Sequence, residues 1–257
     1  MLAADGADES VKKHACRLLS HISAWLDDLL FPQDVVCLCC DHALGSDAKN
    51  GVCGGCLRAL DALARRQEEL EKQGVLPVPH GIRYIHAAFV YEGQARMLIR
   101  RLKYESVRRA ALALAQQMVF LPSDEEEIIV PVPTDKGRER KRGFNQSSVL
   151  ARHIGNTLGM QVTEALVRVD VRRPQTGLTG REREKNLVGC MAASEAVSGK
   201  RVLLVDDVCT TGATLREAAR ALLAAGAAGV GVFTAARAAR AADEPRDPFA
   251  AGEILRK

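Results

Sequence analysis

The spacing of apolar residues changes near residue 82, and this change divides the chain into two parts. Apolar positions in residues 10–31 recur every three to four residues, which predicts an amphipathic helix that ends at Pro32. A charged stretch over residues 57–73 predicts a second helix. Residues 74–81 contain two prolines and two glycines, so we interpret them as a linker.

From residue 82 onward, short apolar runs alternate with stretches of helical period. The uninterrupted run from Val202 to Val205 is typical of a central parallel strand that is buried on both faces. This alternation predicts an α/β fold with a doubly wound, mostly parallel sheet. The expected strands are residues 82–91, 128–132, 202–205 and 230–234, and the expected helices are residues 107–118, 150–158 and 215–223.

The composition is that of a folded, soluble chain. Hydrophobic residues make up 47% and charged residues 26% of the 257 residues, and the formal net charge is only +4. Any basic function must therefore be local, and the 4% of aromatic residues argues against base-stacking platforms for single-stranded nucleic acid. The acidic start does not resemble a signal peptide, and the longest uncharged apolar stretch, residues 221–236, is too short to span a bilayer. We expect a cytoplasmic protein with no membrane span and reduced cysteines.

Four of the eight cysteines form two C-x-x-C pairs, Cys37 with Cys40 and Cys53 with Cys56. A C-x-x-C turn directs both sulfurs toward one point, and two such turns complete a tetrahedral thiolate shell for zinc. Because four thiolates leave no open position, the metal would be structural. The alternative is that these cysteines are small buried apolar residues, and the adjacent Cys39 could compete with Cys40 as a ligand.

The most specific motif is residues 202–215, where a buried strand leads into Asp206 and Asp207, a loop of threonine and glycine, and a helix. Such a loop presents backbone N–H groups and a helix N-terminus to a phosphate. Thr214 and Glu217 also fit a capping box, which would account for part of the loop. It would not account for two adjacent carboxylates, which repel each other and need cations or hydrogen-bond donors. Vicinal hydroxyls of a ribose, with a divalent cation nearby, would meet this need, so we predict a sugar-phosphate site.

Two further segments are rich in basic residues. Residues 136–142 have five of them in seven positions, which would suit a pyrophosphate or a nucleic-acid backbone equally well, or form a solvated loop. Phe144 follows them in a polar setting and implies packing or contact. Residues 171–186 combine glycines with basic residues, which fits a loop that closes over a polyanion and also fits an ordinary surface loop.

These motifs, taken in order, resemble those of the ComF family, phosphoribosyltransferase-like proteins that are associated with bacterial competence and DNA uptake. Residues 202–214 look like the signature for 5-phosphoribosyl-1-pyrophosphate (PRPP) in type I phosphoribosyltransferases. The resemblance covers about residues 29–235. The matching features are residues 29–32 before the paired cysteines, 91–93, 102–104, 130–133, 142–147, 175–178, and Arg181 with 186–187.

The resemblance implies a type I phosphoribosyltransferase fold with a small N-terminal zinc-ribbon and helical module. It implies that Asp206 and Asp207 hold the ribose hydroxyls of PRPP and take part in catalysis, together with Arg181 and Lys185 in a lid over residues 171–186. A magnesium ion would accompany PRPP. The other residues that the resemblance places on PRPP are Thr210, Thr211, Gly212 and Thr214 at the 5′-phosphate, and Pro131, Pro133, Arg142 and Gln146.

We expect an N-terminal helix and four-cysteine zinc module over residues 1–73, a phosphoribosyltransferase-like domain over residues 82–240, and a flexible tail over residues 241–257. Two functions stay open. The first is magnesium-dependent transfer of phosphoribose from PRPP to an unidentified acceptor, with mainly electrostatic catalysis. The second is a non-catalytic accessory protein that binds a phosphoribosyl ligand or single-stranded DNA and docks onto a competence helicase. The sequence has no Walker A motif, so the chain is not itself an ATP-driven motor.

Overall fold

The computed structural model describes residues 36–73, 78–104, 107–118, 126–169 and 189–238. The predicted helix over residues 10–31 and the predicted tail over residues 241–257 lie outside these ranges. So does the predicted lid over residues 171–186, with Arg181 and Lys185. Within the described ranges, no helix is long and apolar enough to cross a membrane.

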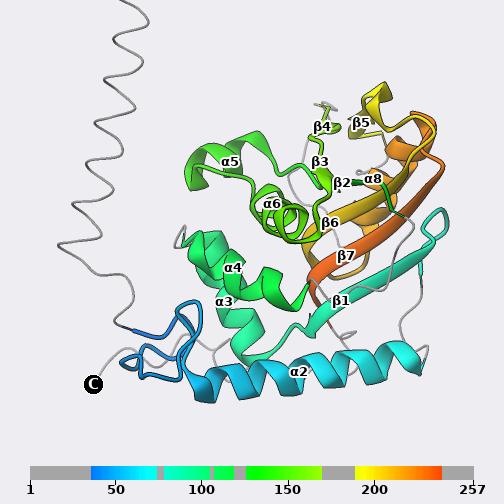
Figure 1. The fold of residues 1–257 in the computed structure, drawn as a ribbon. Helices are drawn as coiled ribbons and strands as arrows, with labels where there is room; N and C mark the ends of the chain where they lie inside the picture. The colour runs from blue at the N-terminus through cyan, green and yellow to red at the C-terminus, as the bar shows by residue number, and fades with distance from the viewer. Residues whose placement is uncertain (1–35, 74–77, 105–106, 119–125, 170–188, 239–257) are drawn as a thin grey trace, which may run out of the picture.

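A five-stranded parallel sheet lies at the centre of the fold (Figure 1). Its strand order is β1-β7-β6-β2-β3, so β6 lies in the middle, as the apolar run at residues 202–205 predicts. All four predicted strands are present, and the predicted doubly wound α/β fold is confirmed. The strands are β1 (Tyr84–Val90), β2 (Ile128–Pro131), β3 (Gln161–Val162), β6 (Arg201–Cys209) and β7 (Gly229–Arg237).

Helices cover both faces of the sheet, because successive side chains of a strand point to opposite faces. Leu203 of β6 and Phe233 of β7 share one buried cluster with α3, α4 and α6, whereas Leu204 and Val232 share another with α8. Figure 1 shows α3, α4 and α6 on one side of the sheet and α8 on the other. The helices are α2 (Gly54–Lys72), α3 (Gly93–Tyr104), α4 (Arg109–Gln117), α5 (Lys136–Arg142), α6 (Gln146–Leu158) and α8 (Ala213–Ala224).

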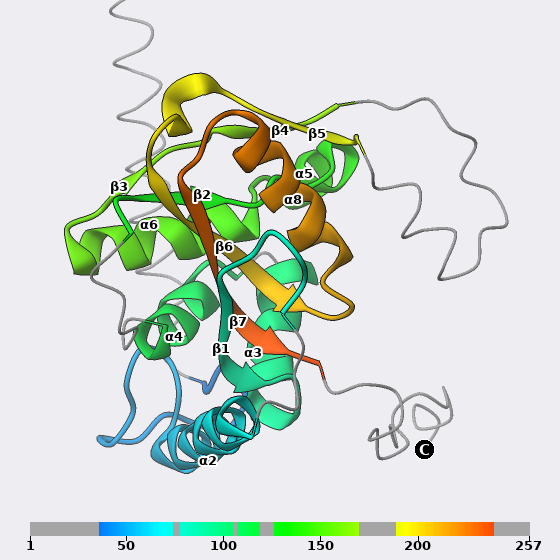
Figure 2. The same cartoon turned by 90° about the vertical axis from the view of Figure 1, so that its right-hand side faces the viewer.

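Helix α2 lies along the outer strand β1 (Figures 1 and 2). Its Glu71 accepts hydrogen bonds from the backbone N–H of Ala87 at 2.9 Å and from Nε2 of Gln67 at 2.9 Å. The other carboxylate oxygen of Glu71 lies 2.8 Å from Nδ1 of His86. Because an unprotected strand edge can pair with another chain, α2 reduces the risk of aggregation through β1.

The cysteine segment packs against the helices on one face of the sheet. Cys37, Leu38 and Val52 belong to the same buried cluster as Leu102 of α3 and Leu114 of α4. The predicted boundary between residues 1–73 and 82–240 therefore crosses a continuous hydrophobic core. Separate folding of these two regions stays a prediction.

Two helices differ from the sequence-based expectation. Helix α3 was not predicted, although its buried residues Ala95, Leu98 and Leu102 have helical spacing, because arginines and a lysine interrupt the apolar pattern. Residues 136–142 form helix α5 and not a loop. The Asp135 carboxylate starts this helix by accepting hydrogen bonds from the N–H groups of Gly137 and Arg138, at 2.9 and 3.2 Å.

A second, two-stranded antiparallel sheet packs against α8 and was not predicted either. It consists of β4 (Leu166–Arg168) and β5 (Met191–Ala193), which flank residues 170–188 in the sequence (Figure 2). Strands of three residues are too short to show a period of two in the sequence.

Candidate functional site

Asp206 and Asp207, which we call the acid pair, lie near the carboxyl end of the middle strand. Strand β6 continues to Cys209, so both residues are part of the strand. Asp206 is half-buried, and Asp207 is 9% exposed. Ligands of open α/β sheets bind outside the carboxyl ends of the strands, and the acid pair lies at that edge.

Oδ1 of Asp206 accepts two hydrogen bonds, from the hydroxyl of Ser147 at 2.8 Å and from the backbone N–H of Asp207 at 2.9 Å. Burial, followed by repulsion from Asp207, raises the pKa of Asp206 to about 7. This shift favours the neutral form of Asp206 more than in an exposed aspartate. A carboxyl group in this state can either accept a hydrogen bond from a ligand hydroxyl or donate one to it.

Lys103 is a residue of this site that the sequence analysis did not assign. Its Nζ lies 2.8 Å from Oδ1 of Asp207, and the two side chains are only 20% and 12% exposed. Burial lowers the pKa of Lys103, but the attraction of Asp207 and then of Asp206 outweighs it and raises the pKa overall. Lys103 thus supplies the positive charge that adjacent carboxylates need. The available signal was its place in the 102–104 motif, which the sequence analysis used only as evidence of resemblance.

The loop after β6 leads into α8 at the same edge of the sheet. Thr210 and Thr211 are exposed, and Oγ1 of Thr211 accepts a hydrogen bond from the N–H of Ala213 at 3.4 Å. Gly212 has a φ of 75°, which residues with a Cβ rarely adopt. Thr214 lies in the first turn of α8. The predicted order of strand, hydroxyl-rich loop and helix is present.

Glu217 joins α8 to the start of β5. Its carboxylate accepts hydrogen bonds from the N–H groups of Gly189 at 2.8 Å and Met191 at 3.2 Å, and from Arg220 at 2.8 Å. Burial would raise the pKa of Glu217, but these donors, Arg220 foremost, lower it. The alternative interpretation of Thr214 and Glu217 as a capping box does not hold, because Gly212 is the N-cap of α8 and Glu217 bonds to another element.

The turn between α5 and α6 is connected to the acid pair through Ser147, the neighbour of the predicted residue Gln146. Nη1 of Arg142 donates a hydrogen bond to Oε1 of Gln146 at 2.9 Å, and Gln146 is 1% exposed. Asn145 caps α6 by accepting from the N–H of Ser147 at 3.1 Å, and its Nδ2 donates to the carbonyl of Val132 at 3.0 Å. Since Ser147 also bonds to Asp206, the turn is anchored both to the acid pair and to the end of β2.

The proline segment after β2 lies beside β6. Pro131 is the last residue of β2, and the N–H of Val132 donates to the carbonyl of Val205 at 2.9 Å. The carbonyl of Pro133 accepts from Nε of Arg168 in β4 at 3.0 Å. Both prolines therefore lie at the edge of the sheet where the acid pair lies.

The four cysteines of the two C-x-x-C pairs converge. The Sγ atoms of Cys37, Cys40, Cys53 and Cys56 all lie within 4.8 Å of one another, and those of Cys40 and Cys53 are 3.8 Å apart. Sulfurs that ligate one tetrahedral zinc ion with Zn–S bonds of ~2.3 Å are about 3.8 Å apart. These four residues could therefore hold a metal such as zinc.

The surroundings of the sulfurs distinguish Cys37 from Cys39. Burial opposes ionisation of Cys37, but backbone N–H donors, including those of Cys53 at 3.3 Å and Cys39 at 3.4 Å, lower its pKa to about 6. Burial, and then the charge of Cys37, raises the pKa of Cys39 to about 12. The ligand assignment rests on the positions of the sulfurs, because the Sγ atoms of the four paired cysteines converge. Cys39 is buried in the hydrophobic cluster and lies outside the group of four.

Several known proteins are similar to this chain. The family described as phosphoribosyl transferase domain matches residues 140–253. DNA utilization protein YhgH of Escherichia coli O157:H7 is 31% identical over 214 residues, which cover 73% of this chain and 90% of that protein. Competence protein F of Haemophilus influenzae is 30% identical over 224 residues, with coverages of 77% and 96%. Among solved structures, the glutamine PRPP amidotransferase from B. subtilis is 23% identical with a TM-score of 0.38, and the match covers 50% of this chain and 26% of that one.

Proposed function

This chain belongs to the family of competence protein F and DNA utilization protein YhgH, and on that basis we propose that it binds PRPP or a related phosphoribosyl compound. The observation that carries the proposal is the acid pair at the end of β6, with Lys103 and Ser147 beside it and the threonine-rich loop into α8 after it. A ribose with two adjacent hydroxyls and a 5′-phosphate matches this order of groups.

Each carboxylate of the acid pair would hold one ribose hydroxyl. The ion pair with Lys103 holds Asp207 in place and the hydrogen bond from Ser147 holds Asp206 in place, so both groups are positioned before the ligand arrives. Thr210, Thr211 and the first N–H groups of α8 would bind the 5′-phosphate. A charged ligand held by fixed donors and acceptors of this kind is stabilised without rearrangement of the site.

The pyrophosphate would lie toward β2 and α5. Pro131 and Pro133 lie there, and Arg142 and Gln146 follow in the turn that is bonded to the acid pair. A magnesium ion bound with PRPP would neutralise part of the pyrophosphate charge. Arg181 and Lys185, in the segment outside the described residues, would close over the ligand in the same proposal.

Calorimetric titration with PRPP, with and without Mg²⁺, tests this proposal. The double substitution Asp206→Asn and Asp207→Asn should weaken PRPP binding roughly 10- to 1,000-fold, because it removes two charge-assisted hydrogen bonds. The matched control is Asp61→Asn on the exposed surface of α2, which should bind PRPP as the wild type does. Wild-type protein that does not bind PRPP would refute the proposal. Release of pyrophosphate with a mixture of bases would indicate a transferase, and tight binding without release an accessory protein.

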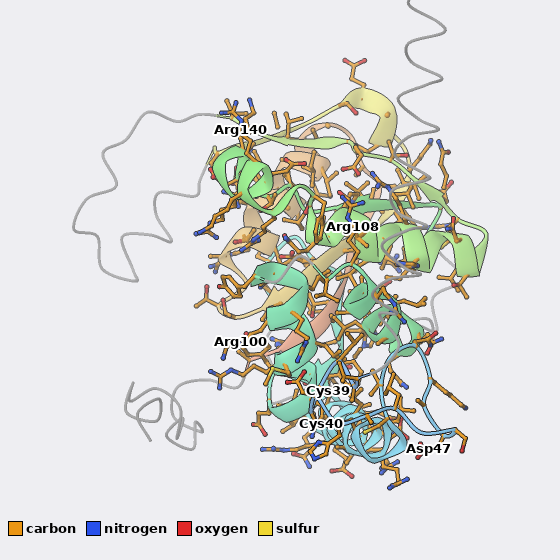
Figure 3. The ribbon with its side chains drawn as sticks, turned by 90° about the vertical axis from the view of Figure 1, so that its left-hand side faces the viewer. Cys39, Cys40, Asp47, Arg100, Arg108 and Arg140 are labelled. Atoms are coloured by element: carbon orange, nitrogen blue, oxygen red, sulfur yellow. The ribbon has the colours of Figure 1, made fainter. Side chains whose placement is uncertain are left out.

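A second function, as an accessory protein that binds single-stranded DNA and docks onto a competence helicase, is favoured by the distribution of arginines. Figure 3 shows the exposed Arg100 of α3, Arg108 just before α4 and Arg140 of α5 along one side, above Cys39 and Cys40. Such a series of cations suits a phosphate backbone. Removing Arg100 and Arg140 should weaken oligonucleotide binding and reduce its salt dependence, without changing the affinity for PRPP.

We also propose that zinc is the metal of the four cysteines and that its role is structural. All four ligand positions would be sulfur, which leaves none for a substrate. In the same proposal, residues 1–73 form the metal module and residues 82–240 the ligand-binding domain, and both contribute to one hydrophobic core.

A further inference from the structure

The last turn of α3 lies against the cysteine segment, residues 36–53. Leu102 of this turn is fully buried in the cluster that the cysteine segment shares with the helices. The guanidinium of Arg101 makes an ion pair with the carboxylate of Asp41, which directly follows Cys40, one of the four converging cysteines. These two contacts fix the end of α3 relative to the cysteines.

The same turn also contacts the acid pair. Nζ of Lys103 lies 2.8 Å from Oδ1 of Asp207. Lys103 and Arg101 are two residues apart within one helical turn, so a displacement of the turn moves both. Because hydrogen-bonded nitrogen and oxygen atoms are about 2.7–3.2 Å apart, a shift of about 1 Å is enough to break the direct contact with Asp207.

The end of α3 is connected to the second carboxylate as well. The guanidinium of Arg142 lies over the ring of Tyr104, the last residue of α3, 5.6 Å from its centre. Arg142 donates a hydrogen bond to Gln146, whose neighbour Ser147 donates one to Asp206. The last turn of α3 therefore has a connection to each member of the acid pair.

The residue before α4 holds the same turn between α5 and α6. The guanidinium of Arg108 lies 4.8 Å from the ring centre of Phe144 and donates a hydrogen bond to the carbonyl of Gly143 at 3.4 Å. Phe144 is 8% exposed, which confirms that it packs. These contacts keep the turn and the helices α3 and α4 together.

The cysteine segment has little regular structure of its own. Residues 36–53, all of which are described, form turns and two isolated β-bridges, Val36 with Ala43 and Lys49 with Val52, and no helix or strand. When such a segment binds a metal, the binding contributes directly to its folding free energy. A metal at the four cysteines would therefore hold the segment, and its contacts to α3, in the arrangement described above.

We infer that Asp41 and Arg101 are positioning residues for the acid pair, through which a metal at the four cysteines strengthens binding of the phosphoribosyl ligand. The inference rests on the proposed function and adds a regulation of that site. Linkage is reciprocal, so the ligand must strengthen metal binding by the same factor. Asp41 is 69% exposed, and exposed ion pairs contribute little to stability. Breaking this pair should therefore change the coupling and not the fold.

The test measures the zinc affinity of the full chain by equilibrium competition with TPEN, a chelator that binds magnesium only weakly. Magnesium is present throughout, and PRPP is present or absent. PRPP should raise the zinc affinity of the wild type about 5- to 100-fold, the usual range of such couplings. Asp41→Asn should reduce this effect to less than about twofold, and should keep its zinc and the melting temperature of the wild type.

Asp47→Asn is the matched control. It removes the same charge from the same segment, but the carboxylate of Asp47 lies against Gly54 at the start of α2. PRPP should raise its zinc affinity as much as it does in the wild type. An equal effect of PRPP in the wild type and in Asp41→Asn, or a loss of the effect in Asp47→Asn, would overturn the inference.

A second series needs no ligand. Lys103→Met and Asp207→Asn break the same ion pair, and each should lower zinc affinity about threefold or more in the absence of PRPP. Glu217→Ala removes hydrogen bonds on the other side of the sheet, at α8, and should leave zinc affinity unchanged (Figure 1). If Glu217→Ala lowers zinc affinity as much as the other two, metal loss follows overall stability and the inference is wrong.

The two series separate this inference from the proposed function. If PRPP binds to the wild type and leaves its zinc affinity unchanged, the inference is wrong and the proposed function stands. If PRPP does not bind to the wild type, the proposed function is refuted, and the series without ligand alone decides whether the last turn of α3 couples the two sites.

Discussion

Asp206 and Asp207 are adjacent in sequence but have different partners. Asp207 makes an ion pair with Lys103, whereas Asp206 bonds to a serine hydroxyl and a backbone N–H. The sequence does not distinguish the two acids, because the pattern of a strand does not show which side chain lies next to a cation. The structure separates them, so single substitutions are more informative about stability than the double one.

Asp206→Asn should change how stability depends on pH. The pKa of Asp206 in the folded protein is about 7, above its ordinary value of 3.8. The folded state thus holds the proton more tightly, and the stability that this acid contributes at low pH is lost as pH rises from about 4 to about 7. An amide does not titrate, so the melting temperature of Asp206→Asn should rise relative to that of the wild type across this range. If the difference in melting temperature between the two proteins stays constant with pH, burial does not raise the pKa of the Asp206 carboxyl group.

Lys103 and Asp207 should be energetically coupled. Lys103→Met leaves the Asp207 carboxylate without its cation, and Asp207→Asn leaves the partly buried Lys103 ammonium group without its ion-pair partner. Each single change should destabilise the protein by about 1–3 kcal/mol, and the double variant by less than the sum, with a coupling of roughly 1–3 kcal/mol. Urea unfolding of the four proteins in the cycle measures it. If the destabilisation of the double variant equals the sum of the two single effects, solvent screens the ion pair.

At the scale of elements, α8 connects the loop after β6 to the two-stranded sheet through Glu217. A Thr-x-x-Glu pattern at the start of a helix usually indicates a local cap, and here the same glutamate bonds to a strand far from it in sequence. Sequence spacing identifies a candidate for local contact only. Sequence spacing does not show whether a group from a distant part of the chain binds the same carboxylate oxygens instead.

Glu217→Ala should destabilise the protein by about 2–4 kcal/mol, because it removes a buried acceptor of backbone and arginine hydrogen bonds. Amide hydrogen exchange in residues 189–193 should accelerate more than in β6 or β7, since the start of β5 loses its attachment to α8. Glu195→Ala, in an exposed 3-10 turn of the same region, is the control and should change stability by less than about 0.5 kcal/mol. Equal effects of the two substitutions would contradict the role assigned to Glu217.

The elements that were predicted well are those whose apolar pattern is not interrupted by charged residues. The strand at residues 202–205 and the helix closed by Gly159 are examples, and the positive φ of Gly159 is what a helix end requires. Helix α3 was missed because its exposed face carries arginines that dilute the apolar period. Lys103 was missed for a related reason, since its partner is about a hundred residues away in the sequence, in another element.

At the scale of the whole molecule, the four-cysteine segment and the sheet share a core, which changes the expected result of losing a metal held by these cysteines. The linker composition alone suggests that residues 33–60 could unfold while the sheet domain stays folded. Since Cys37 and Val52 pack in the cluster that contains Leu102 and Leu114, loss of the metal should also weaken the packing of α3 and α4.

Cys53→Ser should remove the bound zinc and lower the melting temperature in a single transition, because the shared core unfolds as one unit. Cys39→Ser should keep full zinc occupancy, since Cys39 lies outside the group of four sulfurs. Elemental analysis and calorimetry of both variants, and of wild type with a chelator, are the measurements. Zinc retained in Cys53→Ser, or lost in Cys39→Ser, would overturn the ligand assignment.

The pairing of β1 with β7 has a consequence for the synthesis of the protein on the ribosome. Strand β1 ends at Val90, and its partner in the described sheet begins at Gly229. β2 likewise pairs with β3 and with β6, whose last residue is Cys209. At translation rates of roughly 5–20 residues per second, the nascent β1 waits on the order of ten seconds for its neighbour. Helix α2, which is made first and lies against β1, is available to cover it during that interval, so a variant that lacks α2 should aggregate more during synthesis than the full chain does.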